Sequence, residues 1–262
     1  MRAAGFALAA WLLCSAGTEI SAASMSHAQA AQALAALAAA RQQVETADYR
    51  LAGRLVRVDA NGKRISDNIG IAARWFPGVL RVFLDIKSPA AARAHVLLEM
   101  RADGRVTIRI AHPSNATATE LPLSKWAEGP LGDTFSYEDF LGAQYFWPGQ
   151  KDLGQTQFDG HTCDPLLSTP GPTDRTHYAS VKSCLDPSSG FPLSVEKTVK
   201  GSEAVKEFTY FGIRRTRGVW WANQVEAKIR GRPGSTLLIV EHGTPEAHLG
   251  LNNFDPTRLT KF

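Results

Sequence analysis

Residues 79–87 have the sequence VLRVFLDIK, and this stretch decides the fold class. From residue 80 onward every second residue is aliphatic, whereas Arg81, Asp85 and Lys87 stand at positions between. Alternation with a period of two is typical of a β-strand that has one face buried and the other in water. The stretch therefore predicts a strand whose apolar face consists of Leu80, Val82, Leu84 and Ile86.

The same alternation continues toward the C-terminus. Residues 96–100 and 106–110 alternate in the same way, and Asp103-Gly104 between them is a typical hairpin turn. Further strand candidates, separated by glycine-containing turns, are residues 160–166, 176–185, 192–200, 204–214, 219–230 and 235–241. About ten or eleven strands in succession, without the strand–helix alternation of a parallel sheet, predict a mainly β protein with few helices. A large antiparallel sheet of this kind curls, and its concave face can enclose a binding cavity.

One long helix is expected before the strands begin. Residues 29–48 are rich in Ala, Leu, Gln and Arg, and their larger apolar residues recur at helical spacing. We interpret this segment as a helix that packs against the sheet. Its apolar stripe is Leu34, Leu37, Val44 and Ala47.

A second, short helix is predicted within the aromatic-rich residues 111–154. Ser136 can cap it, with Glu138 and Asp139 in the first turn, where the helix dipole favours acids. Adjacent helical residues point to different sides, so we interpret the two acids as capping and solvated groups rather than as a catalytic pair.

The first 30 residues have the pattern of an export signal. Arg2 precedes an 11-residue apolar stretch at residues 3–13, and small residues suitable for cleavage follow at positions 23 and 30. We expect residues 1–23 to be a signal peptide, with cleavage after residue 23 or 30, and residues 24–262 to form a single exported domain. A lipid anchor at Cys14 is the less favoured alternative, because Leu13 stands where a lipoprotein signal has a small residue.

Two cysteines remain after the leader, Cys163 and Cys184. An even number of cysteines in an oxidising compartment predicts a disulfide, which would close a loop of about 20 residues and contribute roughly 3 kcal/mol. The spacing fits neither a redox Cys-x-x-Cys motif nor a metal site. We therefore expect a structural disulfide.

Composition and motifs favour a binding protein. The chain is 44% hydrophobic and 21% charged, with a formal net charge of +4 that is not gathered into a basic run, so nucleic acid is not expected as a partner. No nucleophile elbow, phosphate loop or dinucleotide motif occurs. The seven histidines are scattered, and we expect surface positions for them; a catalytic pair of His161 and His177 is the less favoured alternative. We expect no catalytic residue, no metal and no cofactor.

Residues 131–140, LGDTFSYEDF, resemble the Gly-Ser-Asp-Phe-Ser-Tyr-Glu-Asp-Leu block of the LolA-like outer-membrane lipoprotein-sorting family. The order of features around the block is also similar to that family, from the N-terminal helix to Trp220-Trp221 and Asn253-Phe254-Asp255. The chain departs from the family at residues 106–113, where many relatives have Trp-Leu-Tyr-Leu-Pro followed by paired arginines. The resemblance implies an incomplete antiparallel β-barrel with helices across its mouth, enclosing a hydrophobic cavity for acyl chains, without metal or covalent chemistry.

The cavity candidates follow from this picture. Consecutive strand residues face opposite sides, so only one ring of Trp220-Trp221 is expected inside, and the more apolar alternation favours Trp221. Sealed core is an equally good interpretation of the strand residues. The lid is expected to come from the N-terminal helix and residues 137–147, and Arg54, Arg57, Arg81 and Arg109 are candidates for a basic surface. The ligand-binding candidates are Leu80, Val82, Leu84, Ile86, Val96, Leu98, Met100, Phe135, Tyr137, Phe140 and Trp221.

Together these features predict a non-enzymatic, monomeric periplasmic carrier or chaperone that binds lipid or lipoprotein acyl chains for transfer toward the outer membrane. An inner-membrane transporter and an outer-membrane acceptor would be its partners. The alternative is a ligand-binding sensor domain of the same fold that signals to an envelope protein. An enzyme with a small hydrophobic substrate is disfavoured by the lack of a nucleophile–base pattern. Lipoprotein, hopanoid-like lipid, glycolipid and quinone-sized cargo all remain open.

Overall fold

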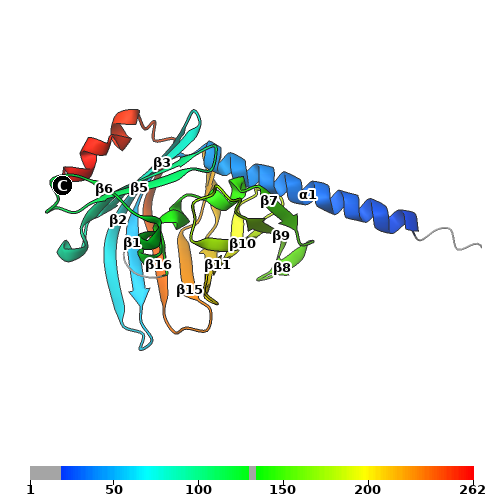
Figure 1. Cartoon of the computed structure of the whole chain (residues 1–262). Coiled ribbons are helices and arrows are strands. Elements are labelled where there is room, and N and C mark those ends of the chain that lie inside the picture. Colours follow the sequence, from blue (N-terminus) through cyan, green and yellow to red (C-terminus); the bar gives the residue numbers. More distant parts are fainter. Residues whose placement is uncertain (1–18, 130–133) are drawn as a thin grey trace, which may run out of the picture.

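The computed structural model describes residues 19–129 and 134–262. The predicted signal peptide falls outside the described residues up to residue 18, and so do residues 131–133 of the family motif. The chain is mainly β with few helices, as expected (Figure 1). The strands are β1 (Asp48–Val58), β2 (Arg64–Phe76), β3 (Val79–Ile86), β4 (Ala94–Arg101), β5 (Val106–Ala111), β6 (Thr119–Glu120), β7 (Gly149–Asp152), β8 (Thr156–Phe158), β9 (His161–Thr169), β10 (Tyr178–Leu185), β11 (Pro192–Val199), β12 (Val205–Phe211), β13 (Arg214–Thr216), β14 (Val219–Trp221), β15 (Gln224–Ile229) and β16 (Ser235–Pro245).

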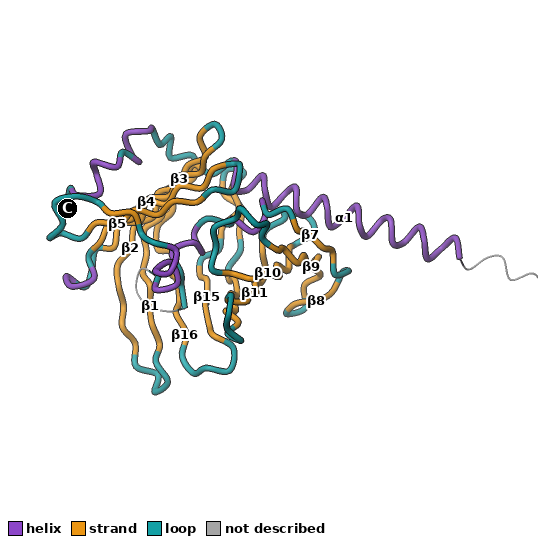
Figure 2. The backbone as a smooth tube through the Cα atoms, viewed as in Figure 1, coloured by secondary structure: helices purple, strands orange, loops and turns teal. Residues whose placement is uncertain are grey.

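In residues 19–129 and 134–262 the helical elements are one α-helix and several short 3-10 turns. These are α1 (Glu19–Glu45), η1 (Ala90–Ala92), η2 (Leu123–Glu128), η3 (Tyr137–Phe140), η4 (Ala143–Phe146), η5 (Leu251–Phe254) and η6 (Pro256–Thr260). Figure 2 shows these short turns in purple, among them those that cross the sheet and those at the C-terminus.

All strand pairs in the main sheet are antiparallel, and their order is β6-β5-β4-β3-β2-β1-β16-β15-β12-β11-β10-β9-β7. The first and last long strands, β1 and β16, pair in the middle and join two meanders into one sheet. The edges β6 and β7 do not pair with each other in the described sheet, so the barrel is incomplete. The predicted curled, open antiparallel sheet is therefore confirmed.

The connection from β6 to β7 fills much of the concave face. Trp126, Tyr137, Leu141 and Trp147 from this connection are buried against the aliphatic residues of β2 to β5. Trp126 also donates a hydrogen bond from Nε1 to the carbonyl oxygen of Leu121, at 3.0 Å. The concave face is thus a packed core over β3 to β5.

The opposite face of β3 and β4 is covered by the C-terminal turns. Phe254 of η5 and Leu259 of η6 are fully buried against Phe83 and Leu97. Phe83 belongs to the face that the alternation of residues 79–87 marks as the more polar one. Both faces of these two strands are therefore buried.

Helix α1 begins ten residues before the predicted start and ends three residues before the predicted end. Its packed face is Ala36, Leu37 and Ala40, which lie against Leu185 and its neighbours on β9 and β10, whereas Leu34 of the predicted stripe is exposed. Small residues suit this face because Gly190 approaches closely: a Cβ there would lie 2.5 Å from the backbone nitrogen of Ala40. The N-terminal part of α1 extends away from the sheet (Figure 1).

The predicted disulfide between Cys163 and Cys184 is present and joins β9 to β10. The two Cα atoms are 5.4 Å apart. Both cysteines are buried, so the disulfide ties together the edge of the sheet on which α1 packs.

Candidate functional site

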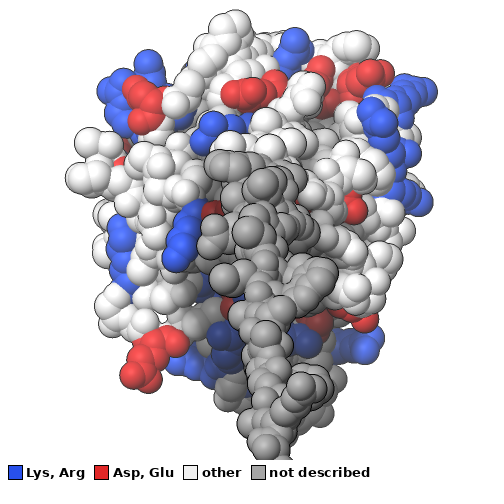
Figure 3. Space-filling view, turned by 90° about the vertical axis from the view of Figure 1, so that its right-hand side faces the viewer, with Lys and Arg blue, Asp and Glu red and all other residues white. Residues whose placement is uncertain are grey.

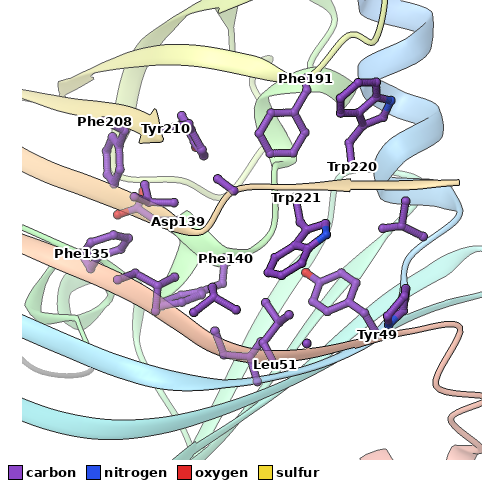
Figure 4. Close-up of a pocket in the computed structure, with 18 of the residues that line it drawn as sticks. Tyr49, Leu51, Phe135, Asp139, Phe140, Phe191, Phe208, Tyr210, Trp220 and Trp221 are labelled. Carbon is purple, nitrogen blue, oxygen red and sulfur yellow. The ribbon is translucent and has the colours of Figure 1, made fainter. Parts of the chain in front are cut away.

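A cavity of about 230 Å³ lies on the concave face, on the side away from the packed core over β3 to β5. Strands β1, β2 and β16 form one wall, β11, β12 and β15 form another, η3 lies at the base, and β14 of the β13–β14 hairpin crosses the cavity (Figure 4). The lining residues are Tyr49, Leu51, Ile71, Phe135, Asp139, Phe140, Phe191, Lys197, Phe208, Tyr210, Val219, Trp220, Trp221, Ala222, Val225, Leu238, Val240, Gly243, Thr244 and Pro245.

The lining is dominated by aromatic and aliphatic side chains. Phe135 packs edge-on against Phe208, with ring centroids 5.4 Å apart, and Phe191 packs edge-on against Tyr210 at 5.8 Å. Such edge-to-face pairs hold aromatic rings in fixed orientations. The cavity therefore presents rigid apolar walls, as a site for an apolar ligand requires.

Trp220 and Trp221 both line the cavity, although alternation along a strand predicts only one ring inside. In Figure 4 the two rings extend to opposite sides of β14, so the alternation is kept and the cavity borders both sides of this strand, which belongs to a separate two-stranded sheet. In Figure 4 the Trp221 ring lies beside Tyr49, and Trp220 lies beside Phe191. Trp221 is further held by a hydrogen bond from its Nε1 to Thr216 Oγ1, at 3.0 Å.

An ion pair between Asp139 and Lys197 lies at the base of the cavity. Lys197 Nζ is 2.7 Å from Asp139 Oδ1, and the two side chains are 5% and 2% exposed. Tyr178 donates its hydroxyl to the same oxygen at 2.7 Å, and the backbone N–H of Ser136 donates to Asp139 Oδ2 at 2.6 Å. Burial alone would raise the pKa of Asp139, but the ammonium groups of Lys197 and Lys206 and the hydrogen bonds to its carboxylate outweigh burial and lower it.

A buried polar network continues behind this pair. Lys206 donates from Nζ to Ser136 Oγ at 2.5 Å, and the Tyr178 hydroxyl oxygen, whose proton goes to Asp139, lies 3.3 Å from the same atom. Asp139 thus faces two lysines, and its neighbour Glu138 faces His177, in a region that water does not reach. The expectation that both acids are solvated was wrong, because the short helix faces inward onto the apolar sides of β11 and β12.

His177 is not a surface histidine. Its Nε2 lies 3.2 Å from Ser136 Oγ, and its Nδ1 lies against Glu138 Oε1. The connectivity is that of a nucleophile, a base and an acid. Ser136 is fully buried, however, and its Oγ also caps η3 and accepts from Lys206. Ser136 is also not among the cavity-lining residues. In this conformation the side chains of Ser136, His177 and Glu138 therefore have a structural role.

Tyr49 and Tyr210 place two further polar groups on the wall. Burial raises the pKa of Tyr49 to about 12, and burial also raises the pKa of Tyr210 well above its usual range. Both hydroxyls are therefore protonated at neutral pH. Within the described part of the chain neither hydroxyl has a hydrogen-bond partner, so both can donate to a ligand.

The structure brings together only some of the residues predicted to bind ligand. Phe135, Phe140 and Trp221 line the cavity. Tyr137 is 6% exposed and belongs to the core. The strand candidates also lie in that core, each at most 3% exposed, and are not among the lining residues: Leu80, Val82, Leu84, Ile86, Val96, Leu98 and Met100.

The structure also bears on two other predictions, the basic surface and the lid. The four arginines proposed as a basic surface are engaged: Arg81 and Arg109 both pair with Glu99, Arg54 pairs with Glu241, and Arg57 lies 3.7 Å from Asp67. Figure 3 likewise shows charges of both signs interspersed over the described part of one face. Of the segments expected to form the lid, residues 137–147 contribute Asp139 and Phe140 to the cavity lining, and the β13–β14 hairpin, which was not predicted, contributes Val219, Trp220 and Trp221.

Sequence reasoning missed Lys197, Tyr49 and the aromatic residues of β12. The sequence does indicate that Lys197 is buried. It lies between Val195 and Val199 at a spacing of two, so it falls on an apolar strand face. A lysine on such a face needs a buried acid as partner. The acids of the short helix were the available partners.

Comparisons with solved structures agree with this architecture. An outer membrane lipoprotein-sorting protein domain from Vibrio parahaemolyticus superposes with a TM-score of 0.76 at 16% identity, covering 86% of this chain and 97% of that one. A DUF1329 family protein from Desulfovibrio piger gives 0.75 at 16% identity, with 88% and 98% covered. A LolA superfamily protein from Nitrosomonas europaea gives 0.62 at 16% identity, with 85% and 96% covered. No curated protein sequence matches the chain.

The fold and its cavity thus define an open antiparallel half-barrel of the LolA-like type, as the resemblance of residues 131–140 implies. A family model whose description is "Uncharacterized protein" matches residues 81–261. Because this match spans well over half of the chain, the chain belongs to that family.

Proposed function

We propose that this protein is a non-enzymatic carrier that binds an acyl chain of a lipid or lipoprotein in the cavity. The observation that carries the proposal is the apolar cavity on the concave face, walled by fixed aromatic rings and crossed by the β13–β14 hairpin. Carrying an acyl chain through water requires such a dry, apolar space. The LolA-like fold, found also in a lipoprotein-sorting domain, supports the same proposal.

The size of the cavity bounds what it holds. At about 30 Å³ for a group of the size of a water molecule or a methylene, it accommodates roughly eight such groups. At about 0.8 kcal/mol for each buried methylene, these contribute about 6 kcal/mol, which corresponds to a dissociation constant between millimolar and micromolar. Binding would thus be reversible. A longer chain would extend through the mouth or require the hairpin to move.

The polar groups on the wall suit the end of such a ligand. The hydroxyls of Tyr49 and Tyr210 can donate hydrogen bonds to an ester or carboxyl oxygen. Asp139 and Lys197 neutralise each other, so the base of the cavity carries no net charge. A neutral, acyl-bearing ligand fits this distribution better than a free anion or cation.

We further propose that the protein works in the periplasm as a monomer, after removal of residues 1–23, between an inner-membrane transporter and an outer-membrane acceptor. Within the described residues, no helix is both long and apolar enough to span a membrane. Mass spectrometry of the protein recovered from a Gram-negative host tests the processing. A mature chain that starts at Ser24 or at Ala31 supports it, and a diacylated chain that starts at Cys14 would replace it with membrane anchoring.

The carrier proposal is tested with the full-length chain. Organic extracts and native mass spectra of the purified protein should contain an acyl-chain species at fixed stoichiometry. The protein should also take up a fluorescent fatty-acid probe. Val225→Trp, which fills the cavity from β15, should abolish uptake, whereas Gln224→Trp on the other face of that strand should not.

A clean protein that takes up no probe would overturn the carrier proposal. In that case a ligand-dependent sensor on the same fold becomes the better hypothesis. A sensor should form a saturable complex with an envelope protein, and the stability of that complex should depend on ligand.

A further inference from the structure

The β13–β14 hairpin stands apart from the main sheet. It leaves β12 after Phe211 and returns to β15 at Gln224, and its two short strands pair only with each other among the described strands. At its base Gly212 has a positive φ of 61°, and a Cβ there would lie 2.8 Å from the Asn223 side chain. The hairpin is therefore attached through a narrow base that fits glycine.

The hairpin contributes three apolar residues to the cavity lining. Val219, Trp220 and Trp221 all line the cavity. Trp221 also lies near Gly243 of β16, since a Cβ at that glycine would be 3.7 Å from the indole ring. Trp220 and Trp221 thus place one indole ring on each side of β14, both against the cavity (Figure 4).

The hairpin is also strongly basic. Arg214, Arg215 and Arg217 lie within four residues and are all exposed. None of them has an ion pair with a described residue; their contacts are with the hairpin itself, the guanidinium of Arg214 over the Trp221 ring at 3.9 Å and Arg215 over the Trp220 ring at 6.0 Å. Phe211, 40% exposed, adds an apolar group at the base.

Several arginines on the main sheet are instead paired with acids. Arg54, Arg81, Arg109 and Arg230 each face a carboxylate within 3.0 Å. Cationic side chains next to tryptophan and an exposed apolar group match the interface of an anionic bilayer, where arginine binds phosphate and indole rings lie at headgroup level. No acidic residue of the hairpin would oppose such a contact.

We propose that the β13–β14 hairpin is the surface by which this protein docks on an anionic phospholipid bilayer. Docking brings the mouth of the cavity onto the membrane and places Trp220 and Trp221 at the headgroups. Displacement of the two rings then opens a path for an acyl chain between cavity and bilayer. Only this last step rests on the proposed carrier function, because docking requires no cargo.

The experiment is co-sedimentation of the full chain with vesicles of phosphatidylglycerol and phosphatidylethanolamine, compared with phosphatidylcholine vesicles. We expect binding only to the anionic vesicles, falling steeply as salt rises. A triple variant, Arg214→Gln/Arg215→Gln/Arg217→Gln, should bind at least ten-fold more weakly. Circular dichroism of each variant verifies that it is folded.

A matched control removes the same charge elsewhere. Lys63, Arg64 and Arg232 are exposed cations at the turns on the opposite end of the sheet, as the β1–β2 and β15–β16 turns in Figure 1 show. Lys63→Gln/Arg64→Gln/Arg232→Gln should retain binding within two-fold. Equal losses in both variants would mean that net charge and not the hairpin drives binding, and would overturn the proposal.

Two measurements distinguish membrane docking from the binding of cargo. Probe uptake without vesicles tests the carrier function, and vesicle binding without probe tests the docking surface, so either can fail alone. Transfer of the bound probe to anionic vesicles tests their connection, and it should be slower in the hairpin variant than in the control. Absence of binding to anionic vesicles at low salt would overturn the proposal and leave an acidic protein as the partner of the arginines.

Discussion

Lys197 Nζ and Asp139 Oδ1 are 2.7 Å apart at the base of an apolar cavity, and both side chains are almost fully buried. They come from distant parts of the chain, Asp139 from η3 and Lys197 from the middle of β11. The pair therefore fixes the β6–β7 connection to the second meander. Its position makes it both a structural link and part of the site.

Asp139→Asn should destabilise the protein by about 3–5 kcal/mol, because it leaves the Lys197 ammonium buried without its anion. Urea unfolding followed by far-UV circular dichroism measures this change. Arg54→Gln, which removes an exposed ion pair with Glu241, should change the free energy of unfolding by no more than about 1 kcal/mol. Similar small losses in both variants would show that the Asp139–Lys197 pair is dispensable.

The contribution of Asp139 should depend on pH. Its pKa is lowered in the folded state, against the effect of burial, by Lys197 and Lys206. A carboxyl with a lowered folded pKa contributes stability that is fully present above its unfolded value of about 3.9 and is lost as pH falls through the folded pKa. The difference in unfolding free energy between wild type and Asp139→Asn should thus be constant from pH 5 to 7, as a rough range, and shrink below about pH 3.9. A difference that grows on acidification would contradict the direction of the shift.

The fold could be predicted from the sequence because period-two alternation reports which strand face is buried. The helix was predicted from the helical spacing of its apolar residues, and the hairpins were predicted from their turn residues. The disulfide was predicted from the even number of cysteines after the leader. The pairing of β1 with β16 could not be recovered, since it joins residues about 190 positions apart and no local pattern encodes it. The burial of Phe83 was missed because the C-terminal turns that cover it are also distant in sequence.

The site was harder to predict than the fold. Alternation identifies an apolar face, but it does not tell whether that face is filled by protein or left open for a ligand. Leu84 and Tyr210 both belong to apolar strand faces, yet Leu84 lies beneath the β6–β7 connection and Tyr210 beside the cavity. The difference depends on where a connection of more than 20 residues crosses the sheet. Hence three predicted residues, Phe135, Phe140 and Trp221, line the cavity, and so do Lys197 and Tyr49, which were not predicted.

Removal of the disulfide should cost about 3 kcal/mol, the chain-entropy value for a loop of this length. The variant is Cys163→Ala/Cys184→Ala, since a single substitution would leave a reactive thiol. Both positions are buried, so alanine also loses some packing. Thermal unfolding of the variant and of the wild type, with and without reductant, measures the effect. A wild type that is unaffected by reductant while the variant is destabilised would assign the loss to packing instead.

Leu84→Ala should lower the stability of the protein but not its affinity for ligand, whereas Trp221→Ala should mainly lower the affinity. Leu84 is fully buried in the core, so its truncation should destabilise the protein by about 2–5 kcal/mol and leave the affinity for a fatty-acid probe unchanged. Trp221 lines the cavity and is only partly buried, so its truncation should weaken probe binding about ten-fold or more, since a large apolar contact contributes about 1.5–3 kcal/mol. Unfolding and probe titration on the same samples measure both quantities. Loss of probe binding in Leu84→Ala but not in Trp221→Ala would mean that the ligand enters between the β6–β7 connection and strands β3 and β4, as the strand alternation alone suggests.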